Sequence, residues 1–269
     1  WPLPSMAPLA LSLALLAKAV AAATTTRVLP LDMSPSSFDD QYQGCVPAMT
    51  AALSALNRSE FQNNPLFAQA WAKAAAAWRG RESPLSPLSP EEAIAIVAYT
   101  MYDIKLYREF NAAVRTAGSS RREYWDNFQY NTLHFLLTQA LGTLRDTQKE
   151  QKCHDVFRGV GGIRFEAQPG DEVRFGQFAS TSLDREVAQS YGNDTVFEVH
   201  TCHGVDIQDF SYDPEDREVL IPPFETFLVT DVTREGDKAR IQLHSARTYS
   251  NYNCEWLRGD NTGDSTGDS

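Results

Sequence analysis

The sequence predicts an α+β fold in a single domain, with a helical N-terminal half packed on a strand-rich C-terminal half. From Gln43 to about Glu150, apolar residues recur at three- and four-residue spacing, which is the period of amphipathic helices. Past His154 the pattern changes to short β-rich runs bounded by Gly, Pro, Asp and Asn. Helices followed by strands, without a Gly-rich or charged linker, favour one α+β domain over a wound parallel sheet.

Four Ala- and Leu-rich segments in the first half are expected to be helical. They are Ala51–Leu56, Phe67–Trp78, Glu91–Ala117 and Thr132–Leu144. The third has the clearest start, because Ser89-Pro90-Glu91-Glu92 combines a capping box with proline at the first helical position.

Six runs of strand length follow in the second half. They are Val156–Val160, Glu172–Phe178, Thr195–Thr201, Val219–Ile221, Thr226–Val232 and Ala239–His244. A short helical segment, Asp184–Tyr191, is expected after Ser180-Thr181-Ser182, where hydroxyl residues are typical helix N-caps.

The composition describes a globular chain and excludes two classes of protein. Of the 269 residues, 24 are basic and 35 acidic, which gives a formal net charge of −11 and no positive field for a nucleic acid. After the N-terminus no apolar run reaches the ~20 residues that a membrane-spanning helix needs. We therefore expect neither a nucleic acid partner nor a transmembrane segment.

The two ends of the chain are expected to lie outside the folded domain. Residues 1–23 read as a signal peptide, with an apolar stretch from Leu9 to Val20 and small residues around a cleavage site. The first methionine is Met6, which leaves open that residues 1–5 are an artefact of gene modelling. At the other end, residues 258–269 carry two Gly-Asp-Ser repeats and are expected to be disordered.

A secreted chain would hold its four cysteines in an oxidising compartment. Cys45, Cys153, Cys202 and Cys254 allow three disulfide pairings, and spacing does not choose among them. Histidines follow Cys153 and Cys202 directly, so zinc is the alternative, although no CxxC or HxxxH spacing is present.

Two N-glycosylation sequons agree with an extracellular chain. They begin at Asn57 and Asn193.

The glycine-rich run Gly159-Val160-Gly161-Gly162 does not predict a dinucleotide-binding fold. That motif needs a helix to follow, whereas Ile163-Arg164-Phe165 is β-like. Arg158, at the end of the preceding β-like run, can instead grip a phosphate with a bidentate guanidinium fork, or simply be an ion-paired strand residue. The chain also lacks the phosphate-loop and nucleophile-elbow motifs, which argues against NTPases and α/β-hydrolases.

A pair of carboxylates is the third candidate feature. Alternate residues of an extended segment share a face, so Asp216 and Glu218 are expected to project the same way, while Glu215 would face the opposite side. The plainer interpretation is a charged loop before an edge strand.

Three blocks in order resemble the arginine-specific mono-ADP-ribosyltransferases of the vertebrate ecto-enzyme family. These are Phe157-Arg158-Gly159-Val160, Gly176-Gln177-Phe178-Ala179-Ser180-Thr181-Ser182, and Glu218-Val219-Leu220-Ile221-Pro222-Pro223-Phe224-Glu225. The likeness runs from about Leu31 to Leu257 and includes Ser37-Phe38-Asp39-Asp40-Gln41-Tyr42, Phe110-Asn111-Ala112-Ala113-Val114-Arg115, Thr132-Leu133-His134-Phe135 and Tyr252-Asn253-Cys254-Glu255.

The resemblance implies a catalytic domain over residues 24–257 that moves ADP-ribose from NAD to an arginine guanidinium of a target protein. NAD is then a consumed substrate, and neither a cofactor nor a metal is expected. The family's arginine–serine–glutamate set falls on Arg158, Ser180 and Glu218. Glu218 would stabilise the oxocarbenium-like state, and Arg158 would hold the pyrophosphate. Ser180 would orient the nicotinamide ribose and Glu218. The backbone of Gly159 would face the nicotinamide amide.

By the same resemblance Cys45 pairs with Cys254 and Cys153 with Cys202. The first bridge would tie the helical half to the end of the strand half, which again supports a single domain.

One departure concerns the acceptor. Arginine-specific members carry Glu-x-Glu, and the first of these acids engages the acceptor guanidinium. In this sequence Asp216-Arg217-Glu218 has aspartate at that position. Two alternatives therefore stay open: an NAD glycohydrolase with weak transfer, or a catalytically silent module that binds NAD or a cell-surface partner.

The expected environment is extracellular or the lumen of the secretory pathway. Some family members end in a hydrophobic tail that is replaced by a lipid anchor, whereas this sequence ends in Gly-Asp-Ser repeats. A secreted monomer is expected, with a GPI anchor only if the C-terminus is truncated.

Overall fold

The computed structural model describes residues 26–81, 86–148 and 153–259. The signal peptide expected at residues 1–23 lies outside these ranges, as do residues 260–269 of the expected tail. Arg258, the first residue of that tail, is instead the last residue of a short 3-10 helix, η2 (Glu255–Arg258). No helix in the described ranges combines the length and the apolar character needed to cross a bilayer.

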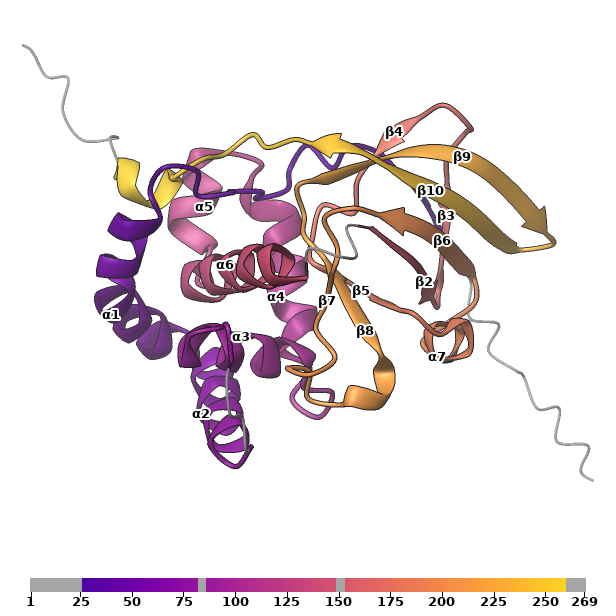
Figure 1. The fold of residues 1–269 in the computed structure, drawn as a ribbon. Coiled ribbons are helices and arrows are strands. Elements are labelled where there is room, and N and C mark those ends of the chain that lie inside the picture. Colours follow the sequence, from indigo (N-terminus) through magenta and orange to yellow (C-terminus); the bar gives the residue numbers. More distant parts are fainter. Residues whose placement is uncertain (1–25, 82–85, 149–152, 260–269) are drawn as a thin grey trace, which may run out of the picture.

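Seven α-helices form among the described residues, six of them before the first long strand. They are α1 (Val46–Asn63), α2 (Pro65–Arg79), α3 (Pro90–Thr100), α4 (Leu106–Ala117), α5 (Arg121–Asn127), α6 (Asn131–Thr147) and α7 (Arg185–Ser190). The first six gather on one side of the strands (Figure 1). The α+β class is thus confirmed, with helices and sheet in the predicted order.

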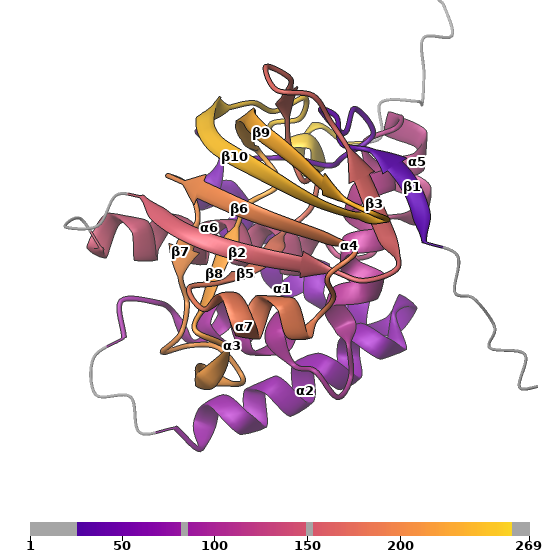
Figure 2. The same cartoon turned by 90° about the vertical axis from the view of Figure 1, so that its right-hand side faces the viewer.

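The strands form one large sheet and one small one. They are β1 (Arg27–Pro30), β2 (His154–Val160), β3 (Ile163–Glu166), β4 (Glu172–Val173), β5 (Ala179–Ser182), β6 (Thr195–Thr201), β7 (Val205–Asp206), β8 (Glu218–Ile221), β9 (Glu225–Glu235) and β10 (Lys238–Thr248). The eight-stranded sheet has the order β4-β9-β10-β6-β2-β5-β8-β7, and β1 pairs with β3. All pairs in the large sheet are antiparallel except β6 with β10 (Figure 2).

The large sheet has a weak joint near its middle. Strands β2 and β5 share a single residue pair, Phe157 with Ser182, whereas β2 and β6 pair along their whole length. Strands that share one pair can diverge on either side of it, because no ladder of hydrogen bonds holds them parallel. This divergence leaves room beside Arg158 and Ser180.

Two expected elements are shorter than predicted. The helical segment Glu91–Ala117 is interrupted, because α3 ends at Thr100 and Lys105 takes the left-handed conformation, with φ 55°, before α4. The interruption contains neither Gly nor Pro, and the apolar spacing continues through it, so periodicity alone gives no sign of a turn. The capping box between Ser89 and Glu92 is present as predicted.

The expected strand Glu172–Phe178 pairs only over its first two residues. Beyond them the chain leaves the sheet, because the Arg174 side chain turns into the protein interior, where it is fully buried. The hydroxyl run Ser180-Thr181-Ser182 is itself strand β5 and not a helix cap. Asp184 caps α7 instead, and accepts hydrogen bonds from two backbone N–H groups of that helix.

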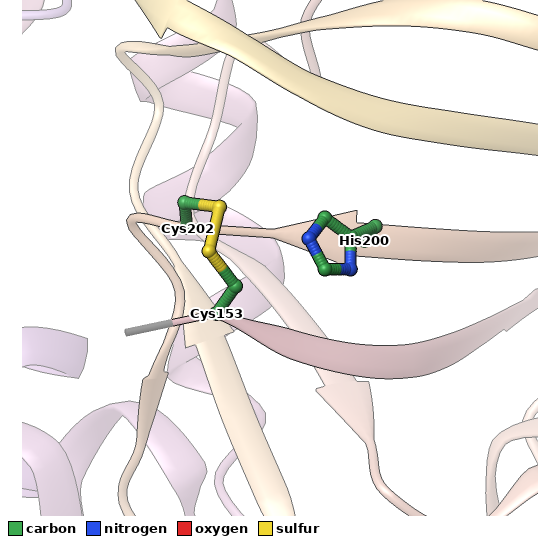
Figure 3. Close-up of side chains that lie close together, drawn as sticks. All are labelled: Cys153, His200 and Cys202. Atoms are coloured by element: carbon green, nitrogen blue, oxygen red, sulfur yellow. A yellow bond between two sulfur atoms is a disulfide. The ribbon is translucent and has the colours of Figure 1, made fainter. Parts of the chain in front are cut away.

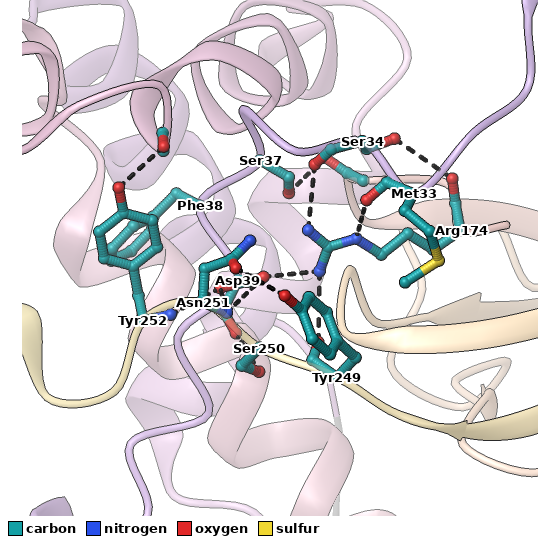
Figure 4. A network of polar contacts seen from close by, with 12 residues as sticks. Met33, Ser34, Ser37, Phe38, Asp39, Arg174, Tyr249, Ser250, Asn251 and Tyr252 are labelled. Carbon is teal, nitrogen blue, oxygen red and sulfur yellow. Dashed lines mark hydrogen bonds and ion pairs between the residues drawn. The ribbon is translucent and has the colours of Figure 1, made fainter.

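A buried ion pair joins three distant segments of the chain (Figure 4). Nη1 of Arg174 lies 2.6 Å from Oδ2 of Asp39, and neither side chain is exposed to solvent. The same guanidinium donates to the carbonyls of Met33, Ser34 and Tyr249. Each of the three guanidinium nitrogens therefore has a partner, which a buried charge requires.

The carboxylates of Asp39 and Asp40 extend this link to the C-terminal segment. Asp39 accepts hydrogen bonds from the backbone N–H groups of Asn251 and Tyr252. Asp40 accepts from those of Cys254 and Glu255. The Cys45–Cys254 disulfide closes the same junction, as the resemblance implied.

We expect Asp39→Asn to lower the free energy of unfolding by about 3 to 5 kcal/mol, because Arg174 would remain as a buried and unpaired cation. Chemical denaturation with both disulfides intact measures the loss. Arg122→Gln is the matched control, since Arg122 pairs with Asp126 on the exposed face of α5 and contributes little. Equal stability of the two variants would contradict the role given to the buried pair.

Candidate active site

A cavity of about 360 Å³ opens where β2 and β5 diverge. Its walls come from β2, β5, β8 and α7, and from the end of α3 and the start of α4. All five residues that the sequence singled out for NAD or acceptor binding line it. They are Arg158, Gly159, Ser180, Asp216 and Glu218. The fold therefore brings together residues that lie up to 60 positions apart in the sequence, from 158 to 218.

Glu218 is the most buried acid in the cavity. It begins β8 opposite Ser182 of β5, and only 6% of its surface is exposed. The pKa of Glu218 is raised to about 7, mainly because the carboxyl is buried. A hydrogen bond from the Ser180 side chain and the charge of Arg158 oppose this shift, and the nearby Asp216 adds to it. Among the described residues Oε1 has no hydrogen-bond partner. A buried carboxylate with an unpartnered oxygen is free to meet a cationic group of a ligand.

Arg158 and Ser180 are coupled across the two diverging strands. Nη1 of Arg158 donates to the backbone carbonyl of Ser180 at 2.6 Å. Burial lowers the pKa of the Arg158 guanidinium, and the neighbouring Glu218 opposes that shift. One edge of the guanidinium is thereby fixed against β5, so the cation has a defined position at the cavity wall.

Tyr99 and Asn111 also support the site, and only Asn111 lies in one of the family motifs named above. The hydroxyl of Tyr99, on α3, donates to the carbonyl of Phe178 at 2.9 Å and receives a hydrogen bond from Asn111. Ser180 Oγ lies 3.5 Å from that hydroxyl, within reach of a weak hydrogen bond. Burial raises the pKa of Tyr99 to about 12, so the phenol stays protonated as a donor. Nothing in the sequence around Tyr99 indicates this role, because the residues just before it, from Ala93 to Ala98, are all apolar.

The carboxylate pair shares the cavity, although the segment between is not extended as predicted. Asp216 ends a single-turn 3-10 helix, η1 (Pro214–Asp216), and Arg217 has φ 46° in the left-handed region. The correction has a physical cause. Asp213 accepts a hydrogen bond from the Glu215 N–H, which starts the turn, and the left-handed residue then reverses it into β8. Glu215 is exposed and does not line the cavity.

Gly159 lines the cavity, but the structure gives a different reason for glycine than a close nicotinamide. A Cβ at this position would lie 2.2 Å from the carbonyl oxygens of Ala188 and Gly192. Any side chain would thus push α7 away from β2. Glycine here permits the close packing of α7 that forms one wall of the cavity.

The disulfide pairing implied by the resemblance is confirmed, and it bears on the zinc alternative. Cys153 is bonded to Cys202, with Cα atoms 4.0 Å apart, and Cys45 to Cys254. His200 lies beside the Cys153–Cys202 bridge (Figure 3). Among the described residues, Cys153, His200 and Cys202 form a cluster that resembles a metal site. Because the two sulfurs are bonded to each other, no thiolate is available, and the Nδ1 atom of His200 pairs with Asp155.

The two sequon asparagines lie in different environments. Asn193 is exposed in the turn between α7 and β6. Asn57 is half-buried within α1, and its Oδ1 is buried without a hydrogen-bond partner among the described residues. Of the two, Asn193 is the more accessible position for a glycan.

Comparisons with known proteins agree with this geometry. The family model described as "NAD:arginine ADP-ribosyltransferase" matches residues 31–251. The erythroblast NAD(P)(+)--arginine ADP-ribosyltransferase of Gallus gallus is 52% identical over 231 residues, which cover 85% of this chain and 76% of that protein. The GPI-linked NAD(P)(+)--arginine ADP-ribosyltransferase 1 of Oryctolagus cuniculus is 48% identical over 245 residues, which cover 85% and 75%.

A solved structure has the same fold. The crystal structure of the eucaryotic mono-ADP-ribosyltransferase ART2.2 matches with a TM-score of 0.72 at 36% identity, covering 84% of this chain and 98% of that chain. A mutant of ART2.2 crystallised in complex with NADH gives the same TM-score and coverage at 35% identity.

The raised pKa of Glu218 predicts a pH-dependent difference in stability between the protein and Glu218→Gln. The native state holds the proton to about pH 7, whereas the unfolded chain releases it near 4.5, so the wild type loses stability as pH rises across this window. Glutamine does not titrate. We expect the stability of Glu218→Gln relative to wild type to rise by at most about 3 kcal/mol between pH 4 and pH 8.5.

Denaturation at the two pH values measures this difference. The control is Glu215→Gln, at an exposed position outside the cavity, for which the relative stability should stay nearly constant. A constant difference between wild type and Glu218→Gln would show that Glu218 is not desolvated in the native state.

Proposed function

The chain belongs to the NAD:arginine ADP-ribosyltransferase family, and on this basis we propose that it transfers ADP-ribose from NAD to an arginine of a target protein. The observation that carries the proposal is the buried carboxylate of Glu218, which shares one cavity with Arg158 and Ser180. A catalytic glutamate stabilises developing positive charge best where solvent does not screen it, and the burial of Glu218 supports this role.

The donor half of the reaction breaks the bond between nicotinamide and ribose. Nicotinamide leaves with the bonding electron pair as a neutral ring, and the ribose develops oxocarbenium character. The carboxylate of Glu218 would stabilise that charge, and Ser180 would hold both the ribose and Glu218. Arg158 would bind the pyrophosphate through the guanidinium edge that does not contact β5. The cationic nicotinamide ring would lower the pKa of Glu218 and favour its ionised form.

The acceptor half forms a bond between a guanidinium nitrogen and the ribose carbon, with loss of one proton from the nitrogen. Asp216 would receive the guanidinium through charge-assisted hydrogen bonds, at the rim of the cavity and next to Glu218. Both acids then serve one reaction: the buried one acts on the donor, and the more accessible one on the acceptor.

Hydrolysis of NAD is the second candidate, and one observation favours it. Aspartate at position 216 is shorter than glutamate by one methylene, so a guanidinium must approach the cavity more closely to bind. Water carries no such demand. The transferase and glycohydrolase therefore share the donor chemistry and differ in how well Asp216 holds an arginine.

The proposed setting is outside the cell, where NAD and arginine-bearing proteins would meet the enzyme as a monomer. Two disulfides within the described residues fit an oxidising compartment, and three mammalian relatives are described as GPI-linked. The exposed Asn193 would carry a glycan.

The role of Glu218 is tested by Glu218→Gln, which keeps the shape and removes the charge. Nicotinamide release and labelling of agmatine, a small guanidine acceptor, are both expected to fall by about 10² to 10³. Labelled NAD and the purified mature chain measure both products. Glu215→Gln, outside the cavity, should keep both activities. Full nicotinamide release by Glu218→Gln would overturn the assignment.

The role of Asp216 is tested by lengthening it. Asp216→Glu is expected to raise the ratio of agmatine labelling to hydrolysis, because misplacing the acceptor by about 1 Å can cost on the order of 100-fold in transfer. Asp216→Asn should lower the same ratio. Arginine transfer that survives intact in Asp216→Asn would show that another group binds the acceptor.

A further inference from the structure

The acceptor acid Asp216 has a direct partner, Tyr191, which directly follows the last residue of α7 and which the family motifs do not include. The hydroxyl of Tyr191 donates to Oδ2 of Asp216 at 2.8 Å. Tyr191 lines the same cavity, yet 62% of its surface is exposed. An exposed phenol is not held by core packing, so its position at the cavity rim depends on this polar contact and on its place at the end of α7.

The loop that carries Asp216 is otherwise fixed through its backbone at the opposite end of α7. Ser182 Oγ donates to the carbonyl of Asp216 at 2.8 Å, and the Leu183 N–H donates to the carbonyl of Arg217 at 3.1 Å. These contacts locate the main chain of the loop but leave the Asp216 side chain free to rotate. Among the described residues, the Tyr191 hydroxyl is the hydrogen-bond partner of that carboxylate.

We propose that Tyr191 is a positioning residue for the acceptor: it fixes the Asp216 carboxylate so that Oδ1 is presented to the incoming guanidinium. This inference rests on the proposed transferase function. With Oδ2 engaged by the phenol, the guanidinium would be bound mainly through the second oxygen and not by a symmetric fork. Aspartate depends on such a contact more than glutamate does, because its shorter side chain has fewer positions from which to bind the guanidinium.

The protonation states of the pair agree with this arrangement. Partial burial of the ring, together with the hydrogen bond to Asp216, raises the pKa of Tyr191, so the phenol remains a donor throughout the neutral range. The groups that face the pair are Glu218 and Tyr107, which raise the same pKa. Among the described residues the phenol donates to Asp216 and not to Glu218.

The test is Tyr191→Phe, which removes one hydroxyl from an exposed ring and leaves the core intact. The ratio of agmatine labelling to nicotinamide release is expected to fall about tenfold, chiefly through a higher KM for agmatine, because transfer alone depends on the orientation of Asp216. The matched control is Tyr249→Phe, which removes a comparable exposed hydrogen bond, to Asn251, at a residue that does not line the cavity. That ratio should not change in the control.

A double variant separates a direct role from an indirect one. If Tyr191 acts through Asp216, Tyr191→Phe should have little further effect on transfer once Asp216→Asn is present. Additive losses, an unchanged ratio in Tyr191→Phe, or an equal fall of both activities would each overturn the proposal. If the wild type labels agmatine and the variants give one of these results, the proposed function stands and the role of Tyr191 is wrong. If the wild type cleaves NAD without labelling agmatine, both the transferase function and the role of Tyr191 are wrong.

Discussion

The buried pairing of Arg174 with Asp39 is the constraint on which the position of the active site depends. From Arg174 to Phe178 the chain forms no ladder hydrogen bonds, and each alternate residue of this stretch is held by another segment. Arg174 is held by Asp39, the Gly176 carbonyl by Ser37, and the Phe178 carbonyl by Tyr99 and Asn111. Strand β5 therefore starts at a fixed place, even though a single residue pair joins it to β2. A site that sits where a sheet opens needs such anchors, because the sheet itself does not supply them.

Glu218 is the acid whose ionised form the cavity disfavours most. Glu218 is almost fully buried beside Asp216, and both features favour its neutral form. An ion pair between Glu218 and Arg158 would neutralise that charge, but Arg158 donates to the Ser180 carbonyl instead. The carboxylate is thus left under-compensated in the free protein, where a cationic ligand can supply what is missing. Stability lost at neutral pH is the consequence of keeping the acid available.

The two acids differ in how they are held. The rigid β8 strand and its pairing with β5 fix Glu218. Asp216 belongs to a turn that depends on Asp213, on a left-handed Arg217 and on contacts with both ends of α7. In the proposed mechanism, donor chemistry therefore depends on the sheet, and acceptor chemistry depends on a loop and a short helix. Changes in acceptor preference can then arise at Tyr191 or Asp216 without disturbing the sheet.

The sequence by itself determined the class of fold and the order of its elements and, with the family resemblance, five residues of the cavity and both disulfides. These rest on local signals: apolar periodicity, a capping box, and short motifs whose residue types match one chemistry. Tertiary structure decided the rest. The turn before Arg217 starts at a local contact, the hydrogen bond from the Glu215 N–H to Asp213, but the left-handed conformation of Arg217 has no signal in the sequence. The break between α3 and α4 and the departure of Arg174 from its strand have no local signature at all. Each is fixed by contacts with residues far along the chain or by a backbone conformation that other contacts stabilise. The Tyr191–Asp216 contact is of the same kind, since it spans 25 residues and exists only because α7 packs against β2 where Gly159 has no side chain.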